Sequence, residues 1–250
     1  MKEIEEVNYD DLNLKGDEQV FHMWEPLNFE IKDDYKYIID NRIFNAFSDL
    51  LAIIATPILW IINIVLFGFD VQGVDNLRKV SGGKVTISNH IHPMDCTMNG
   101  LINFPERTYF PTLATNFKIP FIRHLIRILY AIPIPKKVTQ KEKFFEEIKK
   151  ALLDGKTVHM YPEAALWPYY EKIRPFKKGA FKMAVDAKCP IVPILYEFKE
   201  PEGIFALYKR KKCIHARVLE PVYPNLDLND NEMIEDLQNR VLEEYHKYCN

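Results

Sequence analysis

The sequence contains few cysteines, and no two of them are close together in the chain. The four residues, Cys96, Cys189, Cys213 and Cys249, are scattered through 250 positions. Disulfide frameworks and structural zinc sites both need paired cysteines, so this scatter argues against both and favours a reducing compartment. An apolar secretory leader is also missing, because the chain begins with the acidic stretch MKEIEEVNYDD. We therefore expect a protein of the cytosol or of the cytoplasmic face of the cell membrane.

The sequence also lacks internal repeats and low-complexity stretches, and its length forces no second domain. The formal net charge of −2 hides an uneven distribution. Residues 1–40 hold twelve acidic side chains against four basic ones, whereas residues 41–250 hold twenty-three against twenty-nine. A mildly cationic body suits anionic lipid headgroups or phosphate-bearing substrates.

Charge is absent from one long apolar run, Leu50–Phe69 (LLAIIATPILWIINIVLFGF). At a rise of about 1.5 Å per residue, such a run just crosses a hydrocarbon core of about 30 Å. Pro57 lies inside it and favours a bend, so a helical hairpin that dips into one leaflet is an alternative to a full span. A helix buried in a soluble core is a third interpretation. We expect membrane contact, because so long an uncharged run is rare in soluble proteins.

After this run, short β-like segments alternate with amphipathic helical ones, which predicts an α/β sandwich around a central mixed sheet. We expect an acidic N-terminal segment over residues 1–40, a membrane-associating helix or helical hairpin over 41–70, and one further domain over 71–250. The expected strands are Lys84–Ser88, Tyr109–Thr112, Tyr130–Ile134, Thr157–Tyr161, Ile191–Tyr196 and Ala216–Leu219. The expected helices are Met94–Ile102, Ile119–Ile128, Thr139–Leu153, Gly179–Ala187 and Asn229–Tyr248.

The stretch ISNHIHPMDCTMNG, residues 87–100, carries the main candidate for chemistry. His90 and Asp95 lie five positions apart across a predicted strand-to-helix turn. That spacing lets the carboxylate bind one imidazole nitrogen while the other faces a substrate, as acyl transfer to an alcohol requires. The alternatives are local turn contacts and a metal-binding H-x-H loop that includes His92, although such loops place their aspartate one position earlier.

Charged residues follow two other predicted strands. Lys136 and Lys137 follow the strand ending at Ile134 and can meet a phosphate as point charges. Glu163 follows the strand ending at Tyr161, where it either holds a substrate hydroxyl or fixes its loop by accepting backbone N–H bonds. A third set precedes a predicted helix start and forms either a phosphate cradle or a solvated loop: Arg174, Lys177 and Lys178.

The order of these motifs resembles the glycerolipid acyltransferases, in the branch of the 1-acylglycerol-3-phosphate or lysophospholipid acyltransferases. The matching segments are His90–Asp95, Ile132–Lys136, Pro162–Leu166 and Ile191–Ile194, and the resemblance extends over roughly residues 65–225. It implies transfer of a fatty acyl group from acyl-CoA or acyl carrier protein to the hydroxyl of a lysophospholipid, most simply 1-acyl-glycerol-3-phosphate. It also implies His90 as base, Asp95 as its partner, no cofactor, no metal and no nucleic acid.

Two positions depart from the family pattern and bear on the acceptor. The third motif of the family usually reads P-E-G-T-R, whereas this chain has Leu166 in place of the arginine, and the second motif ends in Lys136 instead of arginine. Without a bidentate arginine, either other cations bind the acceptor phosphate or the acceptor has no terminal phosphate. The cations proposed for the first case are Lys136, Lys137, Arg174 and Lys177.

Membrane lipids are the expected partners, and one more segment fits them. The run YKRKK, residues 208–212, stands beside Phe205 and either rests on anionic headgroups or forms a solvated loop. Two functions of other classes remain open: a metal-dependent hydrolase using His90, His92 and Asp95, and a non-catalytic lipid-binding protein with the same fold.

Overall fold

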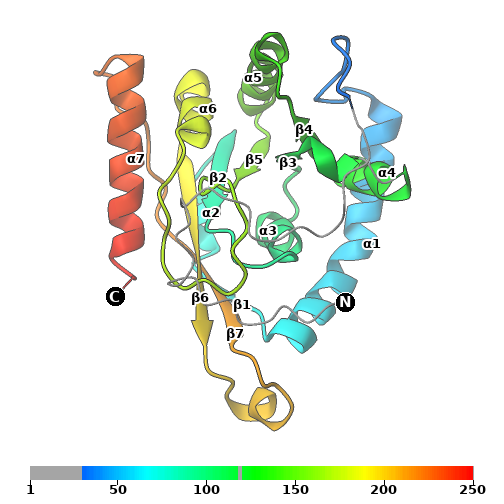
Figure 1. Ribbon diagram of the computed structural model, residues 1–250, viewed down its shortest axis with the longest axis vertical. Coiled ribbons are helices and arrows are strands. Elements are labelled where there is room, and N and C mark those ends of the chain that lie inside the picture. The colour runs from blue at the N-terminus through cyan, green and yellow to red at the C-terminus, as the bar shows by residue number, and fades with distance from the viewer. Residues whose placement is uncertain (1–29, 118–119, 250) are drawn as a thin grey trace.

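The computed structural model describes residues 30–117 and 120–249 and contains a mixed seven-stranded sheet covered by helices on both faces (Figure 1). The strands are β1 (Asp70–Gln72), β2 (Lys84–Ser88), β3 (Thr108–Leu113), β4 (Ala131–Ile134), β5 (Thr157–Met160), β6 (Ile191–Lys199) and β7 (Cys213–Val218). The helices are α1 (Arg42–Phe67), α2 (Asp75–Arg78), α3 (Asp95–Asn103), α4 (Pro120–Ile128), α5 (Val138–Leu153), α6 (Gly179–Ala187) and α7 (Asp230–His246). Two 3-10 turns complete the described elements, η1 (Ala114–Phe117) and η2 (Gly203–Leu207).

The strand order is β1-β7-β6-β2-β5-β3-β4, and the five strands from β6 to β4 are parallel. Strand β7 runs antiparallel to β6, and β1 runs parallel to β7. The predicted α/β architecture with a mixed central sheet is therefore confirmed. Because the carboxyl ends of parallel strands meet at one edge, the segments that follow β2, β5, β3 and β4 are brought together there. We call this the carboxyl edge.

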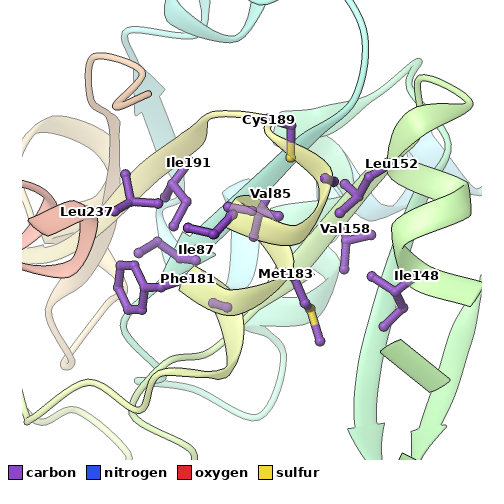
Figure 2. Close-up of a cluster of buried hydrophobic side chains, with 14 of the residues drawn as sticks. Val85, Ile87, Ile148, Leu152, Val158, Phe181, Met183, Cys189, Ile191 and Leu237 are labelled. Atoms are coloured by element: carbon purple, nitrogen blue, oxygen red, sulfur yellow. The ribbon is translucent and has the colours of Figure 1, made fainter. Parts of the chain in front are cut away.

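Side-chain alternation along the strands divides the core between the two faces of the sheet. Val85 and Ile87 of β2 pack beneath α5, α6 and α7, together with Phe181 and Leu237 (Figure 2). On the opposite face, Ile194 of β6 belongs to a second cluster made with α2, α3 and the inner side of α1.

Most element bounds follow the expectation, and β2 and α6 match it at both ends. Strand β1 was not expected, because its three residues DVQ at the sheet edge carry no apolar pattern. The helical-hairpin interpretation of residues 41–70 is wrong: α1 is one helix that continues through Pro57, capped by Asn41 and by Gly68 at φ 57°. A proline removes a single backbone hydrogen bond, and long apolar stretches on both sides sustain the helix.

Helix α1 buries polar side chains against the protein and exposes most of its large apolar ones, while Phe44, Leu59, Trp60 and Phe67 pack against the core. Ser48 and Asn63 are fully buried, Asp49 binds Arg107 at 2.7 Å, and the Asn63 side chain donates to Thr97 of α3 at 3.2 Å. The outer side exposes Ile43, Phe47, Leu50, Ile53, Ile54, Ile58, Ile61, Ile64, Val65 and Leu66. Among the described helices, α1 alone is long and apolar enough to cross a membrane. A helix in a soluble protein has the opposite pattern.

Residues 30–40 pack against α5 of the main body. Tyr37 is buried edge-on against Phe144, and the Gln140 side chain donates to the Ile31 carbonyl at 2.7 Å. Residues 1–29 of the expected acidic segment lie outside the described residues.

Candidate active site

The His90–Asp95 pair forms at the carboxyl edge, where β2 ends and α3 begins. His90 Nδ1 lies 2.7 Å from Asp95 Oδ2, and the His90 side chain keeps 22% of its surface exposed while Asp95 keeps none. Since Nδ1 is bound to the carboxylate, Nε2 is the ring nitrogen left to act on a substrate. The structure therefore brings together the two residues that the spacing singled out.

Asp95 accepts hydrogen bonds from several donors at once. Tyr161 Oη donates to Oδ1 at 2.7 Å, and the backbone N–H groups of Ile91 and His92 donate to Oδ2 at 3.2 and 3.3 Å. Burial by itself raises the pKa of Asp95, but the His90 ring and these hydrogen bonds outweigh it and hold that pKa below its ordinary value. The buried carboxyl group is thus an ionised carboxylate that also shapes the turn carrying His90.

Tyr161 is a site residue that the sequence reasoning missed. Its ring stacks on the His90 ring, with centroids 3.9 Å apart and an interplanar angle of 18°, while its hydroxyl reaches Asp95. Tyr161 follows β5, the parallel neighbour of β2, so the two strands deliver it and His90 side by side. Its place immediately before Pro162–Glu163, at a strand end, was the available signal.

A buried hydrogen-bond network sets the direction of the Tyr161 hydroxyl. Asn99 Nδ2 donates to Tyr161 Oη at 3.2 Å and to Ser88 Oγ at 3.3 Å, while Tyr196 Oη donates to Asn99 Oδ1 at 2.9 Å. Because an amide nitrogen only donates, the Tyr161 oxygen must accept there and direct its own hydrogen to Asp95.

The network continues into a polar stripe on the α3 side of β2 and β5. His159 is buried between Thr86 and Ser88, with ring nitrogens 2.9 and 3.3 Å from their hydroxyl oxygens. Burial lowers the pKa of His159 to about 3, so its ring is neutral near pH 7. In the sequence, this stripe corresponds to the polar residues that alternate with apolar ones in KVTIS and TVHMY. A search for apolar runs alone does not detect it.

Glu163 and Arg174 form a buried ion pair that ties two loops together. Glu163 accepts from the His90 backbone N–H at 3.1 Å, from the Arg174 backbone N–H at 3.0 Å and from the Arg174 guanidinium. Burial raises the pKa of Glu163, against the opposing effect of the Arg174 charge. The guanidinium also donates to the Ala165 carbonyl and covers the Trp167 ring at 4.6 Å.

This arrangement decides between the two roles expected for Glu163 and corrects the one expected for Arg174. Glu163 fixes its loop through backbone N–H bonds and holds the backbone of His90. Arg174, 3% exposed, uses its charge inside the protein, so we do not propose it as a phosphate ligand. A buried carboxylate such as Glu163 needs an oppositely charged partner, and the inward-turned Arg174 side chain provides it.

The remaining cations lie on the surface. Lys136 and Lys137 are exposed directly after β4, at the carboxyl edge, and Lys177 is exposed just before α6. Lys178 Nζ pairs with Glu235 of α7 at 2.7 Å, which turns it toward the helical layer. The predicted cradle therefore does not form from all three of its residues.

His92 faces away from the proposed chemistry. Its Nδ1 accepts the Met94 backbone N–H at 3.1 Å, and its ring packs against Phe67 at 4.6 Å. Burial lowers the pKa of His92 to about 4. In the part of the chain that the structure describes, no group of three or more His, Cys, Asp or Glu side chains is placed to hold a metal ion.

An oriented imidazole–carboxylate pair at the carboxyl edge of an α/β sheet defines a class of general-base catalysts. The family model described as Acyltransferase matches residues 68–197, which is more than half of the chain and includes the whole pair. The protein belongs to this acyltransferase family.

Two curated relatives are acyltransferases by name. A 1-acyl-sn-glycerol-3-phosphate acyltransferase of Saccharomyces cerevisiae is 26% identical over 174 residues, covering 63% of this chain and 53% of the relative. The chloroplastic 1-acyl-sn-glycerol-3-phosphate acyltransferase BAT2 of Brassica napus is 28% identical over 130 residues, covering 50% and 36%. The chain thus spans about half of the first relative and about a third of the second. The crystal structure of the 1-acyl-sn-glycerophosphate acyltransferase PlsC from Thermotoga maritima is 19% identical, with a TM-score of 0.47 over 81% of this chain and 78% of that one.

Proposed function

We propose that the protein transfers a fatty acyl group from an acyl thioester to the hydroxyl of a lysophospholipid, with 1-acyl-glycerol-3-phosphate as the first candidate acceptor. The observation that carries this proposal is the 2.7 Å contact between His90 Nδ1 and Asp95, in a chain of the acyltransferase family. Both curated relatives are named as 1-acyl-sn-glycerol-3-phosphate acyltransferases, which supports the choice of acceptor.

His90 acts as the base in the proposed reaction. Its Nε2 takes the proton of the acceptor hydroxyl as that oxygen bonds to the thioester carbonyl carbon. The C–S bond then breaks, and the leaving thiolate takes the proton back from the imidazole, giving an ester and a free thiol. Asp95 holds the tautomer with hydrogen on Nδ1 and stabilises the transient positive charge, as the orienting acid of a catalytic triad does.

Acceptor binding is proposed for the cations exposed near the carboxyl edge, Lys136, Lys137 and Lys177. Strand β4 lies three strands from β2, which at about 4.8 Å per strand is roughly 14 Å, within reach of a lysine side chain and a glycerophosphate together. The third motif offers no arginine, because Leu166 stands there and is buried. A lyso-lipid without a terminal phosphate is therefore the alternative acceptor. Mass spectrometry of the lipids formed from a mixed lyso-lipid pool, with acyl-CoA and acyl carrier protein donors in separate reactions, separates these choices.

We propose that α1 lies in the plane of one leaflet, on the cytoplasmic face of the membrane. Its outer stripe is apolar along the whole helix. Both Asp49 and Asn63, which are about 21 Å apart along the helix, bind the body of the protein. A spanning orientation would draw those polar contacts into hydrocarbon, where they are costly.

The catalytic proposal is tested with His90→Ala and a matched surface control, His124→Ala on α4. We expect the first variant to lose acyl transfer by a factor of about 10³ or more, with unchanged circular dichroism and melting temperature. The control should keep full activity. Full activity in His90→Ala would remove the proposed base. Stoichiometric zinc or iron in the purified protein, with activity lost to chelators, would favour a metal-dependent hydrolase, and lipid binding without turnover would favour a non-catalytic protein.

A further inference from the structure

The β6–β7 hairpin extends well beyond the carboxyl edge. Strand β2 ends at Ser88 opposite Ile194, but β6 continues for five more residues to Lys199, which is about 16 Å. The hairpin loop, residues 200–212, turns through η2 and projects from the molecule beyond the end of α1 (Figure 1).

The end of this loop is apolar and exposed. Ile204 is 70% exposed and Leu207 is 84% exposed, and η2 contains no buried residue. We call this pair the hairpin tip. Four cations, Lys209 to Lys212, stand behind the tip, and the loop itself contains two acids, Glu200 and Glu202. Lys212 pairs with Glu171 at 2.5 Å, so the excess positive charge comes mainly from the other three cations. Apolar side chains at the end of a projecting loop, backed by cations, match the two zones of a membrane interface.

The base of the loop is bonded to the last turn of α1. Tyr208 Oη donates to the Val65 carbonyl at 2.9 Å, and Lys209 Nζ donates to the Leu66 carbonyl at 2.7 Å. These carbonyls at a helix end have no partner within the helix, so the loop satisfies them. The hairpin loop is thereby bonded to the end of α1 that carries the exposed Val65 and Leu66 side chains.

The same loop is linked through Tyr169 to the segment that carries the candidate base. The Lys211 ammonium lies over the Tyr169 ring at 5.1 Å, and Tyr169 packs against His92 at 5.6 Å. The Tyr169 backbone N–H donates to the Ile91 carbonyl at 2.8 Å. The hairpin loop therefore stands beside the candidate active site rather than at a remote surface.

We propose that the hairpin tip inserts into an anionic phospholipid leaflet and forms a second membrane contact beside the active site. This inference rests on the membrane-bound function proposed above and adds to it a specific lipid preference and a fixed position of the site. Helix α1 supplies apolar area along its length, and the hairpin tip brings the leaflet to the carboxyl edge, where a lyso-lipid enters.

The test uses the full chain and flotation with phosphatidylcholine vesicles containing from none to half phosphatidylglycerol. The double variant Ile204→Ser/Leu207→Ser should partition about tenfold more weakly onto the anionic vesicles, since it removes two apolar side chains from lipid. A matched control, Leu153→Ser/Leu226→Ser, removes two exposed apolar side chains at the opposite edge of the sheet and should bind like the wild type. Arg210→Gln should weaken the dependence on phosphatidylglycerol several-fold.

A second measurement does not depend on affinity. The tryptophan fluorescence of Leu207→Trp, after subtraction of the wild-type spectrum, should shift to shorter wavelength when vesicles are added. Brominated lipid should quench this signal. Equal binding of the tip variant and the wild type, or an emission unchanged by vesicles, would overturn the inference. If the wild type is a dimer in solution and the tip variant is a monomer, the tip contacts a second copy of the chain and the inference is overturned.

The outcomes also separate this inference from the proposed function. A wild-type chain that floats with no vesicle would overturn both membrane proposals. Normal flotation of His90→Ala together with lost acyl transfer would leave the hairpin inference intact.

Discussion

At the scale of single residues, the candidate site depends on one carboxylate with two tasks. Asp95 orients His90 through Oδ2 and also accepts the backbone N–H groups of the turn. Replacing it therefore does more than remove a partner of the base. Tyr161 adds a second control over the same pair, because it contacts the imidazole face and the other carboxylate oxygen.

Asp95→Asn tests this double task. We expect acyl transfer to fall by orders of magnitude, as in His90→Ala. In contrast to His90→Ala, the variant should also unfold more easily, by about 1–3 kcal/mol, because buried donors lose a charged acceptor. Parallel activity and urea-denaturation measurements check both effects. Loss of activity without loss of stability would contradict the described role of the carboxylate in the turn.

Tyr161→Phe keeps the stacked ring and removes the hydroxyl. Without this donor, Asp95 Oδ1 loses its 2.7 Å hydrogen bond, and the ring stacked on His90 loses the hydroxyl that anchors it. We therefore expect kcat to fall about tenfold with little change in KM, which steady-state kinetics measures. Tyr196→Phe removes a hydroxyl that lies two hydrogen bonds further from Asp95, beyond Asn99, and should leave kcat close to that of the wild type.

At the scale of elements, loops rather than strands hold the site together. The carboxyl edge gathers the ends of β2 and β5, but the Glu163–Arg174 pair fixes the loop after β5 against the backbone of His90. Further along, Trp167 N–H donates to the His90 carbonyl at 3.2 Å. The third motif in this chain thus stabilises the site, whatever the acceptor is.

Arg174→Met tests whether this arginine is structural. It should cost about 3–5 kcal/mol of unfolding free energy, because Glu163 is left buried without its partner. The matched control is Lys178→Met, whose solvent-screened pair with Glu235 should contribute far less to stability. A phosphate ligand would instead give a raised KM with stability unchanged, and chemical denaturation with steady-state kinetics distinguishes the two cases.

At the scale of the whole molecule, the fold keeps two histidines neutral in its interior. The pKa of His159 is lowered to about 3 and that of His92 to about 4, in both cases mainly by burial. An unfolded chain takes up these protons near pH 6.5, while the folded chain does so only at lower pH. The unfolded state therefore binds more protons between these values, and stability falls as the pH falls.

We accordingly expect the unfolding free energy to be highest above pH 6.5 and to decrease from there toward pH 4. The slope should approach about 1.4 kcal/mol per pH unit for each histidine. His159→Gln should reduce this slope. Urea denaturation at a series of pH values checks the expectation, and a flat profile between pH 6.5 and 4 would contradict the buried, neutral rings.

The sequence by itself determined the α/β class, most element bounds, the acyltransferase resemblance and the His90–Asp95 pair. All of these depend on local information: short apolar runs, helical periodicity and a five-residue spacing across one turn. The apolar run Leu50–Phe69 was recognisable for the same reason. The sequence did not show that the run forms one helix that continues through Pro57.

Only the tertiary structure decided which polar groups face each other. It turned Arg174 inward to Glu163, brought Tyr161 from another strand onto His90, and bonded the 200–212 loop to the end of α1. The last two contacts join residues far apart in the chain, and the first closes an eleven-residue loop. Burial explains these contacts, because a buried charge or hydroxyl without a hydrogen-bond partner is energetically costly.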